Sequence, residues 1–441
     1  MKVEQPSTMI TLSKAPSLQS LEFLSAIKKM LPIAGILILV VFWIAWIDSF
    51  FVHWGLFPYI GADWGMFWAA AHTFRTNGPA SVYDLHQLGE FSKPLGAFYG
   101  PDAGPLWVNP VPYPPFFMLL LWPFSFFSPV TGLFVWGATN ALAAGYVVVS
   151  LARRFNLSVW LTVPTLFMTL PLGVGLVVGQ PVGLLMLGFY MLYVNLERGE
   201  DLKAGLWGGL LLLKPQYAIV LGLVFLLKQR WSVLGGLTIA GALIAFSTLA
   251  VLGPTDTLAF IHSITGYADG FRDMPFQMSP QKMISWRGVL VALFPNLTEL
   301  AGLIATLFLS ALTLVGIPII WRGSWNPRHE RFSIQMLATM IITMMVGFDV
   351  HIHGAVLLII PAIAVFCQHH RRSLRVLLIT GSFFEVPLAI ILTLLSGRSL
   401  MVTTGLVFAA LQCITLAVIV VPELRRAQRP NANRDIRPVM S

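Results

Sequence analysis

The chain has 441 residues, of which 56% are hydrophobic and only 11% are charged. Ordinary soluble domains carry about 25% charged residues, so this balance excludes a soluble protein. The net charge of +9 comes from Lys and Arg in short clusters between apolar runs, which is a topology signal and not the pattern of a nucleic-acid-binding surface. Apolar runs of about 17–25 residues recur along the chain, and each can span a bilayer as a helix. The sequence therefore predicts an all-α polytopic membrane protein surrounded by membrane lipids, with no nucleic-acid partner.

A polar leader, 1–30, precedes the first apolar run, 31–47. No small-residue cleavage site follows this run, so we expect a retained first helix and not a removed signal peptide. Basic residues elsewhere gather in clusters that the positive-inside rule places in the cytoplasm, together with both termini. These clusters are Lys28 and Lys29, Arg153 and Arg154, Arg198 with Lys203, Lys228 with Arg230, Arg322 with Arg328 and Arg331, Arg371 and Arg372 with Arg375, and the tail 422–441.

With this orientation, the helix at 31–47 runs outward and residues 48–129 form a first outer loop. Within the loop, "YPPFFMLLLWPF" is apolar but too short to cross the membrane. We therefore expect it to form a helix in the outer interface, with its prolines at the start, where they are tolerated. Membrane helices are expected next at 130–152, 158–178 and 180–196.

The following stretch is "AGLWGGLLLLKPQYAIVLGLVFLLKQR". It is too long for one helix, and both of its basic ends should face the cytoplasm. Two short helices that meet at Lys214 and Pro215 satisfy both conditions. Such a break at membrane depth is tolerated only where protein or a water-filled cavity surrounds it.

Further helices are expected at 232–252, 299–321, 334–349, 354–367, 374–395 and 401–421, with a second outer loop at 253–298. The total is about 12 passes when the two short helices are counted separately. No internal repeat or soluble domain is evident, so we expect one transmembrane domain over 1–441.

Polar residues from four regions of the chain converge on the outer face of this topology, and polar groups at or below a membrane surface are usually functional. No phosphate-binding glycine loop, dinucleotide motif or zinc spacing occurs in the sequence. We therefore expect no cofactor and no metal. An outer-face enzyme would then need a substrate already activated in the membrane, such as a lipid-linked phosphate.

Four segments support a family resemblance: "DWGMFWAAAHTFRTNGPASVYD", "YPPFFMLLLWPFSFFSP", "GQPVGLLMLGFYMLYVNLERGEDLKAGLWGGLLLLKPQ" and "QKMISWRG". In this order, over about 60–360, the chain resembles glycosyltransferase family 87 of the GT-C superfamily. That family contains polyprenyl-phosphate-mannose-dependent mannosyltransferases. The resemblance implies a GT-C fold and transfer of mannose or another hexose or pentose from a polyprenyl-phosphate donor to a lipid or glycan acceptor. It also implies a bacterial inner-membrane enzyme whose active site faces the periplasm.

Asp63 is the candidate catalytic residue, as the general base that takes a proton from the acceptor hydroxyl while its oxygen attacks the sugar with inversion. The alternative is that Asp63 only caps a helix. Lys214 is a candidate for binding the donor phosphate, and the alternative is a lysine that snorkels at a helix break. Arg287, His351 and His353 are further phosphate candidates. The alternatives are a contact with lipid headgroups for Arg287 and a structural role for one of the histidines. In "GFDVHIHGAVLLIIPA" either histidine fits the late outer motif of the family.

The candidates for binding sugar or acceptor share polar or aromatic side chains near the outer face. They are Trp64, Trp68, Gln180, Gln216 and Asp84. Structural alternatives remain open for two of them, because Gln180 could cap a helix and Asp84 could form a turn. Two other functions also remain open: a lipid-linked glycan polymerase or ligase, and a lipid or solute transporter. Transporters usually show internal halves and midplane charges, which this chain lacks.

Overall fold

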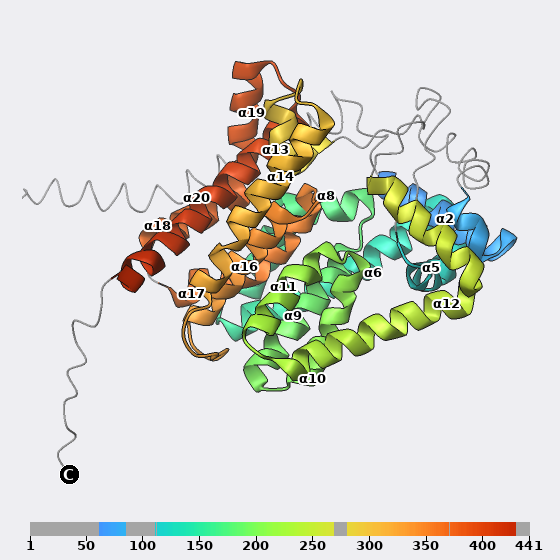
Figure 1. Ribbon diagram of the computed structural model, residues 1–441, viewed down its shortest axis with the longest axis horizontal. Coiled ribbons are helices and arrows are strands. Elements are labelled where there is room, and N and C mark those ends of the chain that lie inside the picture. The colour runs from blue at the N-terminus through green and yellow to red at the C-terminus, as the bar shows by residue number, and fades with distance from the viewer. Residues whose placement is uncertain (1–60, 85–110, 112, 269–279, 370, 429–441) are drawn as a thin grey trace, which may run out of the picture. The chain divides into compact units, whose positions relative to one another are not determined.

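The computed structural model describes residues 61–84, 111, 113–268, 280–369 and 371–428, all of them within the compact unit Leu56–Ser441. Every regular element in these ranges is a helix (Figure 1). The all-α prediction is therefore confirmed for this part of the chain. The expected leader at 1–30, the helix at 31–47 and the end of the tail lie outside the described residues.

Short helices form the described part of the predicted first outer loop. They are α2 (Ala62–Asn77), η3 (Pro79–Tyr83), α5 (Pro115–Leu121) and η5 (Trp122–Phe126). Pro115 begins α5, where its missing N–H costs no helical hydrogen bond. The segment Pro115–Phe126 is apolar but too short to span a bilayer, as the sequence predicts.

Four helices are long and apolar enough to cross a membrane. They are α6 (Pro129–Arg154), the part Trp231–Leu258 of α12 (Trp231–Ala268), the run Glu299–Ile320 made by α14 (Glu299–Leu314) and α15 (Gly316–Ile320), and the part Leu400–Pro422 of α20 (Leu400–Gln428). The backbone of α12 breaks at Gly253, whose φ is +73°, next to the predicted end of this span at 252. Glycine tolerates a positive φ that other residues avoid.

Two further predicted spans are bent. Helix α7 (Val159–Phe167) meets α8 (Leu170–Val178) at 63°. The second bent pair joins Arg372–Ser382 to Glu385–Ser396 at 67°, through α18 (Arg372–Ile379), η9 (Thr380–Phe384) and α19 (Glu385–Ser396). If each pair is one span, the described residues contain up to six.

The other predicted passes are shorter helices. They are α9 (Val182–Arg198), α10 (Asp201–Gly208), η6 (Gly209–Leu213), α11 (Gln216–Leu227), α16 (Arg331–Val346), η8 (Ile352–Leu358) and α17 (Ile359–Gln368). Helices η7 (Pro280–Lys282) and α13 (Trp286–Leu293) lie in the predicted second outer loop. Length and composition therefore support four to six spans in the described residues. The predicted count of about 12 is not confirmed, because several apolar runs form helices too short or too bent to count as single spans.

The predicted corner at Lys214 is present. Helices α10 and η6 run up to Lys214, whose φ of −132° leaves the helical region, and α11 starts after Pro215. Helix α10 packs closely on α12, since a Cβ on Gly205 would lie 2.1 Å from the Val233 carbonyl oxygen. The corner is therefore held by a tightly packed helix pair.

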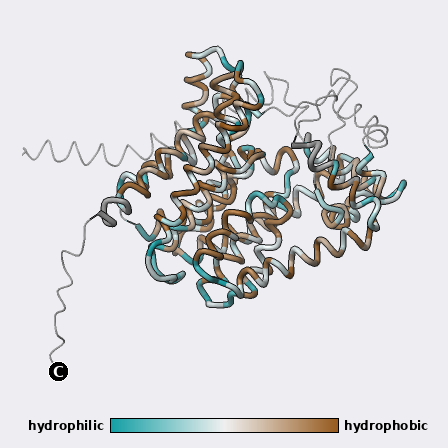
Figure 2. Tube along the Cα trace, in the orientation of Figure 1, coloured by the Kyte–Doolittle hydropathy of each residue, from teal (hydrophilic) through white to brown (hydrophobic). Residues whose placement is uncertain are grey.

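One end of the helices carries the basic clusters. Arg154, at the end of α6, forms an ion pair of 2.5 Å with Glu197, near the end of α9. The Arg328 Nε donates to the Glu197 carbonyl at 3.0 Å. Lys228 Nζ, just after α11, donates to the Gly323 carbonyl at 2.6 Å. These contacts place four separate basic segments at one end, here called the basic end, and Figure 2 shows apolar residues along the helices between the ends.

The opposite ends of the same helices carry the polar candidates. Gln180 lies just before α9, Lys214 just before α11, and His351 and His353 follow α16. Since α9 has 17 residues, about 25 Å separates its two ends. Basic clusters and candidate site residues therefore lie on opposite sides of the helical layer.

This arrangement predicts the outcome of cysteine labelling. Single cysteines at Asp63, Arg287 and His351 should react with a membrane-impermeant thiol reagent from the outside, and those at Arg153 and Arg371 only after the membrane is opened. Labelling of positions 63 and 153 from the same side would refute the topology.

The labelling background needs a control. Cys367 and Cys413 are free thiols and half-buried, so both should first be replaced by serine. The resulting cysteine-free protein must give no label from either side.

Candidate active site

Asp63 lies in the first turn of α2, at the point where α2 meets α8. The N-cap of α2 is Gly61, which makes no side-chain cap, and the Gly61 N–H donates to the Val177 carbonyl at 2.8 Å. The Asp63 Oδ2 accepts a hydrogen bond of 2.7 Å from Gln180 Nε2. The carboxylate is thus tied to a residue 117 positions away, and the capping bond of the alternative interpretation is not seen.

The turn at Gly179 brings these two residues together. Gly179 has a φ of +87°, and a Cβ there would lie 2.5 Å from the Trp64 Cβ. Only glycine combines this backbone conformation with so close an approach. Trp136 Nε1 donates to the Gly179 carbonyl at 2.7 Å, which fixes the turn from the other side.

Gln180 is buried, and both the nitrogen and the oxygen of its side-chain amide form hydrogen bonds. Its Nε2 donates to Asp63, and its Oε1 accepts a hydrogen bond of 3.4 Å from the Tyr113 hydroxyl. Tyr113 precedes α5 and is itself buried. A side chain held at both ends orients the Asp63 carboxylate, which is the arrangement that a proton acceptor needs.

Lys214 faces His353 at the corner between η6 and α11. Lys214 Nζ lies 3.1 Å from His353 Nε2 and 6.0 Å from the centre of the Tyr113 ring. Because an ammonium group only donates, Nε2 of His353 is the acceptor and the imidazole is neutral. Tyr113 therefore lies between the Asp63–Gln180 pair and Lys214.

The segment after α16 completes the cluster. Asp349 Oδ1 and His351 Nε2 are 3.2 Å apart, and Gln216 Nε2 donates to the Asp349 carbonyl at 3.0 Å. The rings of His351 and His353 stack with their centres 5.9 Å apart. Both histidines thus belong to one polar cluster with Lys214.

Arg287 reaches the same segment from α13, in the predicted second outer loop. The Ile284 N–H donates to the Val350 carbonyl at 2.8 Å. The Arg287 guanidinium lies 4.0 Å from the centre of the Phe348 ring. A second cation therefore stands beside the Asp349–His353 segment.

The charges of the cluster act on Asp63. Burial raises the pKa of the Asp63 carboxyl above its ordinary value, and the Asp349 charge raises this pKa further. The hydrogen bond from Gln180 and the charges of Lys214 and His351 lower the same pKa. Groups from α2, the Lys214 corner and the segment after α16 therefore share one electrostatic environment, and a perturbed carboxyl in such a setting is typical of a functional site.

Three predicted residues lie outside the polar cluster, although Trp64 packs against the Gly179 turn. Trp64 and Trp68 are buried, and their indole N–H groups donate to the Pro129 and Phe127 carbonyls at 2.8 and 3.0 Å. Asp84 is exposed and follows η3, where its N–H donates to the Ser81 carbonyl. These contacts stabilise the loop, and a role of the three residues in sugar or acceptor binding stays a prediction.

Two residues of the cluster were not among the predicted site residues. Tyr113 opens the "YPP" segment, but its sequence position gives no sign of contact with Gln180. Asp349 lies two residues before His351, in the segment quoted for its two histidines, and its charge beside them was the available signal. Among the described residues, no group of three or more His, Cys, Asp or Glu could hold a metal ion.

A comparison with known protein families matches residues 112–348 to glycosyltransferase family 87. The matched region is more than half of the 441 residues. The chain belongs to glycosyltransferase family 87. This confirms the resemblance found in the sequence, and the family 87 chain is therefore a multi-pass membrane glycosyltransferase. Searches of curated proteins and of solved structures gave no match.

The residues that match the family model include Tyr113, Gln180, Lys214 and Arg287. It begins after Asp63 and ends just before Asp349 and the two histidines. The match itself assigns no role to any of these residues.

Proposed function

We propose that this family 87 protein transfers a sugar from a polyprenyl-phosphate donor to a lipid or glycan acceptor. The observation that supports this most is the placement of Asp63. Its carboxylate is held by Gln180 and shares an environment with Lys214 and the neighbouring histidines. A positioned base beside a cation is what displacement of a phosphate from a sugar requires.

In the proposed reaction, Asp63 accepts the proton of the acceptor hydroxyl. The hydroxyl oxygen forms a bond to the anomeric carbon while the bond from that carbon to the phosphate oxygen breaks. The leaving polyprenyl phosphate keeps the electron pair. One in-line displacement inverts the anomeric configuration and needs no second carboxylate as a nucleophile.

Lys214 is proposed to stabilise the charge that develops on the leaving phosphate. Its ammonium can donate to a phosphate oxygen while one N–H remains on His353. Arg287 and His351 flank the same place and are proposed as further donors. In a site with little water, such fixed charges act more strongly than they do in solution.

The proposed reaction takes place on the membrane face opposite the basic end, which the positive-inside rule assigns to the outside. We propose the inner membrane of a bacterium, with the site facing the periplasm. Mannose is the sugar that the family suggests, and other hexoses or pentoses fit the same chemistry. Gln216, Trp64, Trp68 and Asp84 stay candidates for contacts with sugar or acceptor.

The direct test is incubation of purified protein with a panel of polyprenyl-phosphate sugars and membrane-lipid acceptors. We expect release of polyprenyl phosphate and transfer of sugar with one donor, and no transfer of sugar from the corresponding nucleotide sugars. Direct use of a nucleotide sugar would refute the proposed donor. Movement of an unaltered lipid or solute across vesicles, without sugar transfer, would favour the transporter.

The raised pKa of Asp63 predicts the pH dependence of this reaction. Asp63 must be ionised to accept a proton, so kcat/KM should fall as the pH drops through this raised pKa. Gln180→Leu removes a hydrogen bond that lowers the pKa, and the acidic limb should therefore move to higher pH. The measurement is the pH profile of polyprenyl phosphate release.

A matched control for Gln180→Leu is Gln335→Leu, since Gln335 is also buried but donates to the Ile320 carbonyl at the basic end. The control should leave the acidic limb in place. An unshifted limb in Gln180→Leu, with a uniform loss of rate, would mean that Gln180 does not tune Asp63.

A further inference from the structure

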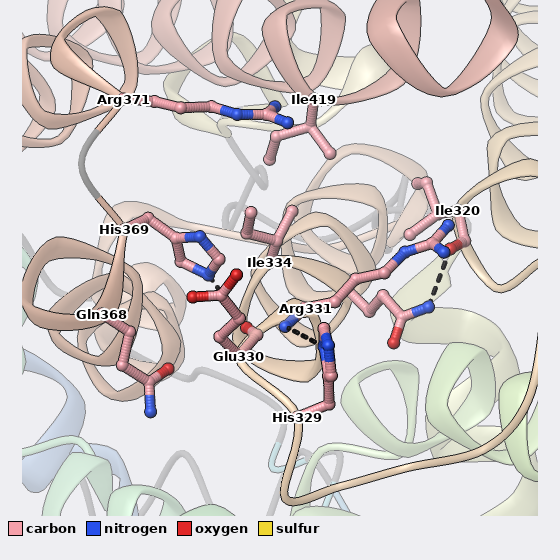
Figure 3. A pocket seen from close by; sticks show the side chains of 10 residues that line it. Ile320, His329, Glu330, Arg331, Ile334, Gln368, His369, Arg371 and Ile419 are labelled. Carbon is pink, nitrogen blue, oxygen red and sulfur yellow. Dashed lines mark hydrogen bonds between the residues drawn. The ribbon is translucent and has the colours of Figure 1, made fainter. Parts of the chain in front are cut away.

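A cavity of about 410 Å³ lies at the basic end (Figure 3). Its wall comes from the residues before and within the start of α16, the segment between α17 and α18, and α20. Arg331 begins α16, and the polar candidates around Asp349 follow the other end of that helix. The length of α16 therefore separates this cavity from the candidate active site.

The lining of the cavity is cationic. Arg331 and Arg371 contribute two guanidinium groups, against one carboxylate from Glu330. Figure 3 shows the Arg371 side chain extending across the cavity towards Ile419. Among the described residues, its guanidinium has no hydrogen bond, ion pair or ring contact. A cation at a cavity wall without a partner of opposite charge is available to an anion.

Two histidines of the cavity have defined hydrogen bonds. The Arg331 backbone N–H donates to His329 Nδ1 at 3.1 Å, so the neutral ring carries its proton on Nε2. His369 Nε2 lies 2.9 Å from the Glu330 carbonyl oxygen and donates to it, because a carbonyl only accepts. Among the described residues, the Nε2–H of His329 has no acceptor, so it can act as a further donor at the cavity beside the two guanidinium groups.

The cavity lies at the level where apolar helices end. Ile320 is the last residue of the span Glu299–Ile320, and Ile419 lies three residues before the end of the span Leu400–Pro422; both line the cavity. In a membrane, the ends of apolar spans mark the headgroup region. An anion at this level, beside isoleucine side chains, matches a lipid headgroup better than a solute from the water.

We propose that this cavity binds the phosphate of an anionic membrane lipid on the basic face. Arg331 and Arg371 hold the phosphate, His329 donates a further hydrogen bond, and the isoleucines contact the first acyl carbons. Basic pockets between membrane helices on the cytoplasmic side can bind the headgroups of anionic lipids. The site is separate from the proposed donor site and does not depend on the sugar donor.

The test is binding of defined lipids to the purified full chain, counted by native mass spectrometry. One molecule of phosphatidylglycerol should bind tightly to each protein, and phosphatidylcholine with the same acyl chains should bind more weakly. Each arginine near an anionic lipid contributes about fivefold in affinity, so R331Q/R371Q should bind phosphatidylglycerol about 25-fold more weakly. R371K keeps the charge and should retain most of the affinity.

The matched control is R372Q, because Arg372 is exposed, adjacent to Arg371 and outside the cavity lining. It should bind phosphatidylglycerol like the unchanged protein. Equal binding of phosphatidylcholine and phosphatidylglycerol by the unchanged protein would overturn the proposal without any variant. Equal losses of phosphatidylglycerol affinity in R372Q and R331Q/R371Q would also overturn the proposal. Displacement of the lipid by millimolar inorganic phosphate would assign the cavity to a soluble phosphate instead.

Discussion

Asp63→Asn should lower the rate of sugar transfer by a factor of about 10²–10⁴, the usual cost of removing a general base. Asparagine keeps the size of the side chain and can still bond to Gln180, but it cannot take the proton of the acceptor. Donor binding and folding should therefore stay close to those of the unchanged protein. The measurements are polyprenyl phosphate release and donor binding by the purified variant.

Asp63→Glu tests whether the reaction depends on the position of the carboxylate as well as on its presence. The added methylene moves the carboxylate by about 1 Å, and such a displacement can cost roughly 100-fold in rate. Asp256→Asn is the control, since Asp256 lies on α12 and outside the polar cluster, and it should retain activity. If Asp63→Asn turns over within about threefold of the unchanged protein, Asp63 is not the base.

Lys214→Ala should lower transfer by a factor of about 10²–10³, the cost of losing one donor that stabilises developing negative charge. Lys214→Arg should be impaired less, because it keeps a cation near the phosphate, although its planar fork has a different geometry. Donor binding should follow the same order. The measurement is kcat and donor affinity for the two variants in parallel.

Lys203→Ala is the matched control for Lys214→Ala. Lys203 is exposed at the basic end and pairs with Glu200 at 3.2 Å, so its removal should leave transfer unchanged. Similar and mild effects of Lys214→Ala and Lys214→Arg would reduce Lys214 to a residue that shapes the helix corner.

The long apolar helices could be predicted closely from the sequence. The expected span at 130–152 corresponds to α6 (Pro129–Arg154), and the expected end at 252 is next to the break at Gly253. The helix corner at Lys214 could be predicted because the apolar stretch around it is too long for one helix and has basic residues at both ends. The number of passes could not be predicted, because a run of apolar residues does not distinguish a spanning helix from a short buried one.

The candidate site was predicted only in part. Charge, motif and the predicted topology indicated Asp63, Lys214 and the two histidines as residues of one membrane face, but gave none of the contacts between them. Their meeting depends on the Gly179 turn and on Tyr113, which contacts Gln180 across 67 positions of the chain. Such long-range contacts depend on how the helices pack, and the local sequence around each residue does not indicate them.

The lengths of the helices below the cluster determine how deep the proposed reaction lies. Helices α11 and α16 have 12 and 16 residues, so they extend about 18 and 24 Å from the basic end. The hydrocarbon layer is about 30 Å thick, so if the basic end lies at its inner boundary, Lys214 at the far end of α11 lies below the plane of the far headgroups. Both the phosphate of the donor lipid and the acceptor hydroxyl must then descend from the headgroup level to meet at Lys214 and Asp63. This depth favours slender acceptors, such as a lipid or the end of a glycan chain, over the surface of a folded protein.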